Sequence, residues 1–460
     1  MSKLQRDFTK GPIGRELLSF SIPFLLANLL QALYGAVDML VVGNFASPDP
    51  AVCTAVLSGV NIGGQITHML TMMVSGLTVA GTVMLGQYIG ADKPEEGRKT
   101  VGTTLTLLFL LAVAFTVVML LLSGPILRLL QTPAESFAAA QEYLNICLVG
   151  TVFIFGYNAI SAIQRGMGDS VRPLIFVGIA CLVNVFLDLW FVKGLMWGAA
   201  GAAWATVIAQ AISLIIAAVY LARNRFIFDF KLSSFKIHRD KAAMMFKLGI
   251  PSSVQSIIVN ISFLIMTALV NVIGGVTASA AVGVVGKLNG FGILPAVAMS
   301  SSVSAFAAQN IGARRYDRAR KSLLSAIVIA MTCSLVIFAA LQLFPTQIIG
   351  IFAQDADTVL QGVTYVRAYS YDYLLVPVLF CLNGLIMGAG HTGYTLLTGA
   401  VSSILLRIPL AYVLGRGDMG LTGVGVAAPL ASLGGVVLAA WFVLTNRWMR
   451  DKTGISGESA

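Results

Sequence analysis

The sequence predicts an all-α membrane protein with twelve transmembrane helices, arranged as two six-helix lobes related by a pseudo-twofold axis along the membrane normal. The chain is 57% hydrophobic and only 11% charged, whereas soluble domains carry roughly 25% charged residues. Apolar runs of about 20 residues, long enough to cross a bilayer as helices, recur along the chain, and its two halves repeat each other. These observations exclude a soluble globular protein.

Twelve apolar segments are bounded by glycine, proline or charged residues. No short apolar core with a small-residue cleavage site precedes the first of them, so we expect no signal peptide. The expected spans are residues 17–43, 55–81, 101–123, 139–162, 171–191, 198–222, 244–273, 278–305, 323–344, 366–387, 396–415 and 420–446.

The second half of the chain repeats the first. The segment GQYIGADKPEEGRK, which ends at Lys99, matches AQNIGARRYDRARK, which ends at Lys321, at an offset of 222 residues. The same offset relates Gly166 to Gly388, and before the first loop the offset becomes 228. An even number of spans in each copy starts both copies on the same side of the membrane, which predicts an axis along the membrane normal.

The basic residues predict the orientation of the chain. Most of the 30 Lys and Arg residues fall on the side that holds both termini, and the positive-inside rule places that side in the cytoplasm. The net charge of +10 therefore marks a membrane face and predicts no nucleic-acid partner. We expect an N-lobe over 1–222, a basic amphipathic linker over 223–243 that meets lipid or a regulatory partner, a C-lobe over 244–446 and a cytoplasmic tail over 447–460.

Acidic residues lie within the spans of the N-lobe. Asp38 and Asp188 fall about 8 to 12 Å beneath the outer surface at the rise of a helix, with Asn184 one turn from Asp188 and Thr206 on the next span. A charged side chain in hydrocarbon costs on the order of 2.5 to 3.5 kcal/mol, so these carboxylates need a partner or a function. Oxygen ligands suit a small hard cation, and neighbouring carboxylates suit a shared proton. A hydrogen-bonded contact between helices is the structural alternative.

With these residues the sequence resembles the multidrug and toxic compound extrusion (MATE) family of cation-coupled exporters. The resemblance covers essentially the whole chain and includes the segment VDMLVVGNF and the paired IGA motifs. It implies export of amphipathic, often cationic compounds, with H⁺ and/or Na⁺ bound at Asp38, Asn184, Asp188 and Thr206. Some members have a second cation site in the C-lobe, but here its first helix offers Gln255 and no acid. The chain thus resembles the DinF-like branch more than the NorM-like branch.

Further residues are candidates for binding substrate. Aromatic side chains stack on organic cations and methionines adapt to varied ligands. A lipid-facing or core position explains the methionines equally well, and core packing is the favoured explanation for any one aromatic residue. The candidates for a substrate cavity are Tyr34, Met69, Met73, Phe153, Tyr157 and Gln255. The charged residues Lys287, Asp372 and Arg407 in the C-lobe spans form either a neutralising network or a group that faces substrate.

The sequence favours a secondary transporter over other classes of membrane protein. It contains no Walker A motif, so ATP is not expected to drive transport directly. We expect no enzymatic activity, no cofactor, no metal beyond Na⁺, and a monomer whose partners are small molecules and the lipid bilayer of the cell membrane. A lipid-linked sugar flippase of a related fold is the alternative, and a non-transporting receptor or scaffold is a third hypothesis.

Overall fold

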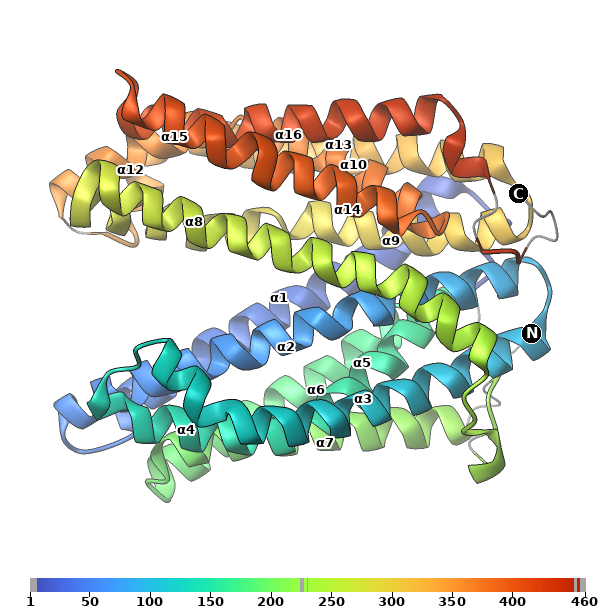
Figure 1. The fold of residues 1–460 in the computed structure, drawn as a ribbon, viewed down its shortest axis with the longest axis horizontal. Coiled ribbons are helices and arrows are strands. Elements are labelled where there is room, and N and C mark those ends of the chain that lie inside the picture. The colour runs from blue at the N-terminus through green and yellow to red at the C-terminus, as the bar shows by residue number, and fades with distance from the viewer. Residues whose placement is uncertain (1–5, 224–226, 230, 354, 451–452, 456–460) are drawn as a thin grey trace. The chain divides into compact units, whose positions relative to one another are not determined.

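The computed structural model describes residues 6–223, 227–229, 231–353, 355–450 and 453–455. These residues form helices joined by short turns, and no strand occurs among them (Figure 1). The helices of the first half are α1 (Ile13–Phe45), α2 (Pro50–Gly90), α3 (Pro94–Leu129), α4 (Ala134–Val149), α5 (Thr151–Gly166), α6 (Val171–Asp188), the π-helix η1 (Leu189–Gly194) and α7 (Gly198–Arg223). Those of the second half are the 3₁₀ turn η2 (Leu232–Ser234), α8 (Arg239–Gly292), α9 (Leu294–Gly312), α10 (Tyr316–Leu343), α11 (Pro345–Gly350), α12 (Ala356–Tyr369), α13 (Asp372–Gly388), α14 (Thr392–Ala400), the π-helix η3 (Val401–Arg407), α15 (Ile408–Arg416), α16 (Gly420–Leu444) and the 3₁₀ turn η4 (Arg447–Met449).

The helices account for the predicted membrane spans. Nine stretches within the described residues are long and apolar enough to cross a membrane, and two bent pairs, α4 with α5 and α12 with α13, bring the number to eleven. α8 runs for 54 residues, but Gly275 has non-helical angles (φ 66°, ψ −157°) and divides it into two arms. An unbroken helix of that length would measure about 80 Å, against a hydrocarbon core of about 30 Å. The second arm, continued by α9, is therefore the twelfth crossing.

The backbone repeats in the second half at the offset seen in the sequence. α4 and α5 meet at Gly150 with a bend of 50°, and α12 and α13 meet at the equivalent point with a bend of 47°. Left-handed φ angles recur in the same way, at Gly168 and Gly390 (80° and 81°) and at Asp92 and Arg314 (53° and 57°). Glycine adopts this conformation without steric cost and often ends a helix. The duplication is thus structural as well as sequential.

Two compact units divide the chain close to the predicted lobe boundary. The first, here called the N-lobe unit, contains Leu26–Leu85 and Lys93–Lys247 together with Arg6. The second, the C-lobe unit, contains Asp7–Leu25, Gly86–Asp92 and the residues from Leu248 onward. α1, α2 and α8 therefore contribute residues to both units. The predicted division into residues 1–222 and 244–446 contains no helix that is shared in this way.

Within the units, the helices pack in corresponding ways. In the N-lobe unit α7 contacts α4, α5 and α6, and its small residues Ala199, Ala202 and Ala203 are buried in the core. In the C-lobe unit α16 contacts α12, α13 and α15, and α13 also contacts α9 and α10 (Figure 1). Small side chains let helix backbones approach closely in membranes, where packing replaces the hydrophobic effect as the driving force.

The N-terminal segment is part of the packed C-lobe unit. Phe8 is fully buried, and its ring centroid lies 5.4 Å from that of Phe20 and 5.3 Å from that of Phe306. The Phe8 amide donates to the Gln309 side-chain oxygen at 3.0 Å, and Arg318 Nε donates to the Phe8 carbonyl oxygen at 2.9 Å. Apolar burial and backbone hydrogen bonds together hold this segment against α9 and α10.

The two copies of the repeated IGA motif touch each other in the C-lobe unit. A Cβ atom on Gly90 would lie 1.9 Å from the Gln309 carbonyl oxygen, and one on Gly312 would lie 2.0 Å from the Gln87 carbonyl oxygen. The ends of α2 and α9 therefore cross with each glycine against the glutamine of the other copy. We call this contact of Gln87, Gly90, Gln309 and Gly312 the Gln–Gly crossing; only glycine fits its two close approaches.

The described part of the linker between the halves packs against α3. Residues 224–226 and 230 lie outside the described residues, and the described part contains a single 3₁₀ turn before α8 begins at Arg239. Its backbone is bound to α3: Arg98 Nε donates to the Ile227 carbonyl oxygen and the His238 amide donates to Thr103 Oγ1. Phe228 is buried. Contacts with α3 thus hold the described part of the linker, and its predicted meeting with lipid or a regulatory partner stays a prediction.

Candidate cation-binding site

Three helices of the N-lobe unit carry the predicted site. On α1, Tyr34 and Asp38 are four residues apart and share one face, and Asp38 is 7% exposed. On α6, Asn184 and Asp188 have the same spacing and are 1% and 0% exposed. α6 begins after the left-handed turn at Gly168 and gives way to the π-helix η1 directly after Asp188. π-Helical segments occur frequently at functional sites.

The four predicted residues lie together. Asn184 Nδ2 is 3.5 Å from Thr206 Oγ1 on α7, which joins α6 to α7. Asp188 lies within electrostatic range of Asp38, and the Tyr34 hydroxyl lies within that range of both carboxylates. The structure thus places acids from α1 and α6 beside each other, as the sequence predicts for a site that spans several helices.

Several oxygens of this cluster have no hydrogen-bond partner among the described residues. They are Asp38 Oδ1, Asn184 Oδ1 and both carboxylate oxygens of Asp188. Neither carboxylate forms an ion pair with a described Lys, Arg or His. A buried charge without a partner is costly, and two adjacent carboxylates repel each other. The donor set fits a bound proton or a small hard cation such as Na⁺, which prefers oxygen ligands.

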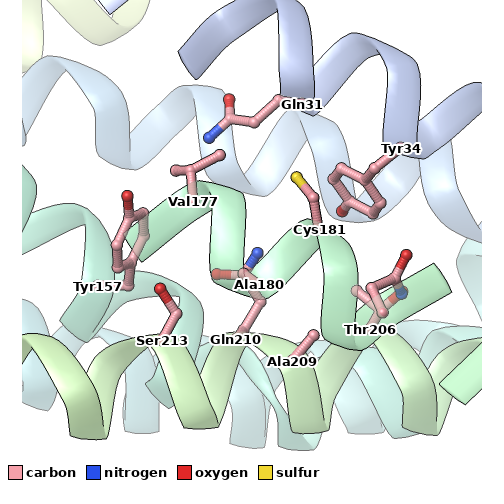
Figure 2. A pocket seen from close by; sticks show the side chains of 11 residues that line it. Gln31, Tyr34, Tyr157, Val177, Ala180, Cys181, Thr206, Ala209, Gln210 and Ser213 are labelled. Atoms are coloured by element: carbon pink, nitrogen blue, oxygen red, sulfur yellow. The ribbon is translucent and has the colours of Figure 1, made fainter. Parts of the chain in front are cut away.

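A narrow cavity opens from this cluster along α6. Figure 2 shows Tyr34 and Gln31 of α1 facing Cys181 of α6, with Thr206 and Gln210 of α7 on the other side. The volume of the cavity is about 10 Å³, room for about one water molecule. It suits an ion or a water molecule and is too small for an organic compound in this conformation.

The predicted substrate residues divide between this cavity and other places. Tyr34 and Tyr157 line the N-lobe cavity, and the Tyr157 hydroxyl donates to the Pro173 carbonyl oxygen at 3.1 Å. Met69 is 50% exposed, and Met73 packs against an apolar cluster around Leu70. The other two residues lie elsewhere: Phe153 is half-buried on α5 outside the cavity, and Gln255 lines a separate cavity in the C-lobe unit.

Sequence reasoning missed three polar residues of the N-lobe cavity: Gln31, Gln210 and Ser213. Gln31 precedes Tyr34 by one turn on α1, and Gln210 and Ser213 continue the face of Thr206 along α7. The signal was therefore present as polar stripes at helical spacing on two otherwise apolar helices. The prediction rests on charged residues with their neighbours, on aromatic residues, on methionines and on Gln255, and it does not include these three residues.

The C-lobe charges form a smaller network than predicted. Asp372, at the first turn of α13, and Arg407, at the end of η3, line one cavity of the C-lobe unit. No ion pair of 4.0 Å or less joins them among the described residues. The Asp372 carboxylate accepts a hydrogen bond from the Ser432 hydroxyl, and the Arg407 guanidinium lies 5.0 Å from the centre of the Phe263 ring. Lys287 is exposed on α8 and does not line this cavity.

Known proteins resemble the chain over nearly its whole length. The family model MatE matches residues 23–190 and 251–413. The probable multidrug resistance protein YpnP of Bacillus subtilis is 30% identical, with 97% of this chain and 98% of that protein covered. The probable multidrug resistance protein NorM of Thermotoga maritima is 23% identical over 95% of this chain and 93% of that protein.

Solved structures share the fold. One, an outward-facing conformation of a multidrug resistance MATE family transporter of the MOP superfamily, matches with a TM-score of 0.89. The alignment covers 96% of this chain and 98% of that chain, at 22% sequence identity. The likeness therefore extends over both halves of the repeat.

Proposed function

Because the chain belongs to the MATE family, we propose that it exports amphipathic, often cationic drugs and toxic organic compounds from the cell by cation-coupled antiport. The coupling ion is H⁺, Na⁺ or both, and its entry into the cell drives the export of the compound. The observation that carries this proposal is the pair of buried carboxylates, Asp38 and Asp188, without a cationic side chain beside them among the described residues.

The proposal includes an orientation in the cell membrane. The excess of Lys and Arg on the side of the termini puts both termini in the cytoplasm. Asp38 then lies seven residues before the outer end of α1 at Phe45, about 10 Å deep at the rise of a helix. Asp188 lies at the outer end of α6, one helical turn from Asn184. An ion from outside reaches this depth without crossing the whole bilayer.

The chemistry of the cluster accounts for coupling. With both carboxylates ionised, their repulsion and the cost of burying charge favour separation of α1 from α6. A proton on one acid, or Na⁺ held by Asp38, Asn184 and Asp188, removes that repulsion and favours their approach. The ion thus binds more tightly to one arrangement of the helices than to the other, and that differential affinity is the driving force of a conformational change.

Helix α1 is the element that this change moves. Pro23 lies inside α1 and lacks the amide hydrogen that would continue the backbone ladder, so the helix can bend there at low cost. Movement of α1 towards α6 narrows the cavity that Tyr34 and Gln31 line. Cation and substrate then compete for the N-lobe unit, and each tenfold change in affinity corresponds to about 1.4 kcal/mol of coupling.

Efflux from proteoliposomes tests the proposal. Purified protein is reconstituted with a fluorescent cationic dye, and Na⁺ and pH gradients are imposed separately. We expect dye movement opposite to the gradient of at least one ion, and its loss when an ionophore dissipates that gradient. Dye movement that is independent of both the Na⁺ and the pH gradient would refute cation coupling. No dye movement under any gradient would favour a flippase or a non-transporting protein.

A further inference from the structure

The C-lobe unit contains a cavity of its own, apart from the Asp38–Asp188 cluster. Its volume is about 150 Å³, whereas the N-lobe cavity measures about 10 Å³. A protein cavity of about 150 Å³ can hold a molecule the size of benzene. The lining combines side-chain amides and hydroxyls with the rings of Phe263, Tyr369 and Phe380. Aromatic walls with a few convergent polar groups are typical of ligand sites.

Two residues that line this cavity carry opposite charges. Asp372 is 3% exposed and Arg407 is 8% exposed. Asp372 Oδ1 and Arg407 Nε are both buried without a hydrogen-bond partner among the described residues, and no ion pair of 4.0 Å or less joins the two side chains. Separated buried charges keep their desolvation cost without the full gain of direct pairing.

Each charged group has a neighbour of its own, and Arg407 remains within electrostatic range of Asp372. Asp372 bonds with Ser432 of α16, and the Arg407 guanidinium lies 5.0 Å from the centre of the Phe263 ring on α8. Stacking of this kind fixes the plane of a guanidinium and leaves its N–H groups directed outward from its edge. Asp372 and Arg407 thus present a carboxylate and a guanidinium to one enclosed space.

We propose that this cavity binds the head group of amphipathic zwitterions, with the ligand carboxylate on Arg407 and the ligand ammonium on Asp372. The proposal rests on the export function above and adds a class of substrate to it. Arg binds carboxylates through paired hydrogen bonds, and the aromatic lining, Phe263 and Phe380, contacts the apolar part of the ligand. A purely cationic or purely anionic ligand would leave one of the two buried charges unpaired.

Binding of three matched probes tests this proposal without requiring transport. Nε-dansyl-L-lysine carries a free carboxylate, a free α-ammonium and a fluorescent apolar group. Its methyl ester lacks the carboxylate charge, and its Nα-acetyl derivative lacks the ammonium charge. Dansyl fluorescence is titrated against wild-type protein in lipid nanodiscs, with empty nanodiscs subtracted. Because a hydrogen bond to a charged group contributes about 1.5–3 kcal/mol, we expect the zwitterion to bind roughly tenfold to a hundredfold more tightly than either derivative.

Charge-removing variants assign each preference to a side chain. Arg407→Gln should abolish the preference for the zwitterion over the methyl ester and keep its preference over the acetyl derivative. Asp372→Asn should do the reverse. Arg416→Gln is the matched control, because Arg416 also stacks on an aromatic ring, that of Tyr412 at 4.2 Å, but is exposed and lies outside the cavity. Asp418→Asn, at an exposed position, is the control for the acid.

The comparison of probes on wild-type protein keeps the test decisive even where a variant fails to fold. Equal affinity for the three probes, or no binding of any of them, would overturn the proposal. So would a folded Arg407→Gln variant that weakens the ester and the zwitterion alike, because that result indicates a structural role. Loss of ion-driven dye efflux with the probe preferences intact would instead refute the export function and leave the zwitterion site standing.

Discussion

The two halves of the molecule hold cavities at equivalent positions but line them with different chemistry. At the offset of the repeat, residues of the N-lobe cavity correspond to residues of the C-lobe cavity. The corresponding pairs include Gln31 with Val259, Tyr157 with Leu379, Ala180 with Ser402, Cys181 with Ser403 and Gln210 with Ser432. Duplication has therefore repeated the place of the cavity as well as the path of the backbone.

The charged groups of the two halves do not correspond. Asp38, Asp188 and Thr206 are equivalent to Met266, Leu410 and Ala428, and these three lie in one apolar cluster of the C-lobe unit. Conversely, the positions equivalent to Asp372 and Arg407 are glycine and valine, Gly150 and Val185. Among the described residues, the acids of the Asp38–Asp188 cluster thus have no acidic equivalent in the second copy, and Asp372 and Arg407 of the C-lobe cavity have no charged equivalent in the first. The two copies therefore share their backbone path and the position of the cavity, whereas their charged residues arose separately in each copy.

Removal of the N-lobe acids should have the largest effect. We expect Asp38→Asn and Asp188→Asn each to abolish ion-driven efflux with expression largely intact, because the amide keeps the shape of the side chain and loses the counter-charge of the ion. The equivalent Met266→Leu and the C-lobe variant Gln255→Ala should transport nearly as well as wild type. The measurement is dye efflux from proteoliposomes at matched protein content.

Full transport by both Asp38→Asn and Asp188→Asn would show that the N-lobe acids are not required for ion-driven efflux. An equal loss in Gln255→Ala would point instead to a second ion site in the C-lobe unit.

Substitution at the Gln–Gly crossing should show where the two copies remain alike. Gly90→Ala and Gly312→Ala should each lower the thermal stability, because a Cβ atom at 1.9 or 2.0 Å from a backbone oxygen forces the helices apart. Overpacking of this kind costs about 1–3 kcal/mol. Gly64→Ala on α2, where a Cβ meets nothing within 4 Å, is the matched control. Melting temperatures in detergent measure the three variants; strongly unequal losses for Gly90 and Gly312 would show that the crossing is not symmetric.

A double-mutant cycle should reveal whether the C-lobe charges act as a pair. We expect Asp372→Asn and Arg407→Gln each to destabilise the protein, and the double variant to lose less than the sum of the two. Breaking a buried ion pair in direct contact costs roughly 3–5 kcal/mol. The coupling energy between Asp372 and Arg407 should be nearer 0.5–3 kcal/mol, because no ion pair of 4.0 Å or less joins them among the described residues. Thermal unfolding of the four proteins measures the cycle. Additive losses would mean that the charges act independently.

Helix capping should give the smallest difference between the halves. Asp355 is the N-cap of α12 and accepts from the Thr358 amide at 2.9 Å, whereas the equivalent α4 begins after Pro133 with no side-chain cap. The bonds from the Thr358 amide and hydroxyl lower the pKa of Asp355 below its usual value. A lowered folded pKa stabilises the protein above the unfolded pKa and loses that effect as the pH falls through the folded pKa.

We therefore expect Asp355→Ala to lower the melting temperature slightly at pH 7, and the difference to shrink below about pH 4. Asp357→Ala, in the first turn of the same helix but without the capping bond, should change the melting temperature less at both pH values. A difference that persists unchanged at low pH would exclude the cap as its cause.

Hydropathy and charge were sufficient to predict the spans and to single out the buried acids Asp38 and Asp188. Asp38 and Asp188 stand out because charged residues are rare in apolar helices, and the repeat located the equivalent helices in the second half. The break of α8 at Gly275 falls between the expected spans 244–273 and 278–305, whereas the bend at Gly150 was not predictable, because an average over a whole span does not register one residue's backbone angles. Burial of Phe8 depends on partners some 300 residues away, which no local pattern contains.

The Gln–Gly crossing also bears on how two copies of a duplicated gene segment drift apart. Over most of the repeat one apolar residue has replaced another, yet the sequences GQYIGA and AQNIGA still share four of their six letters. At the crossing each glycine faces backbone atoms of the other copy, so a larger residue there finds no room unless the two backbones move apart. The two glycines are thus restricted by the backbone of the other copy, and the motif that identifies the duplication lies where the two copies contact each other.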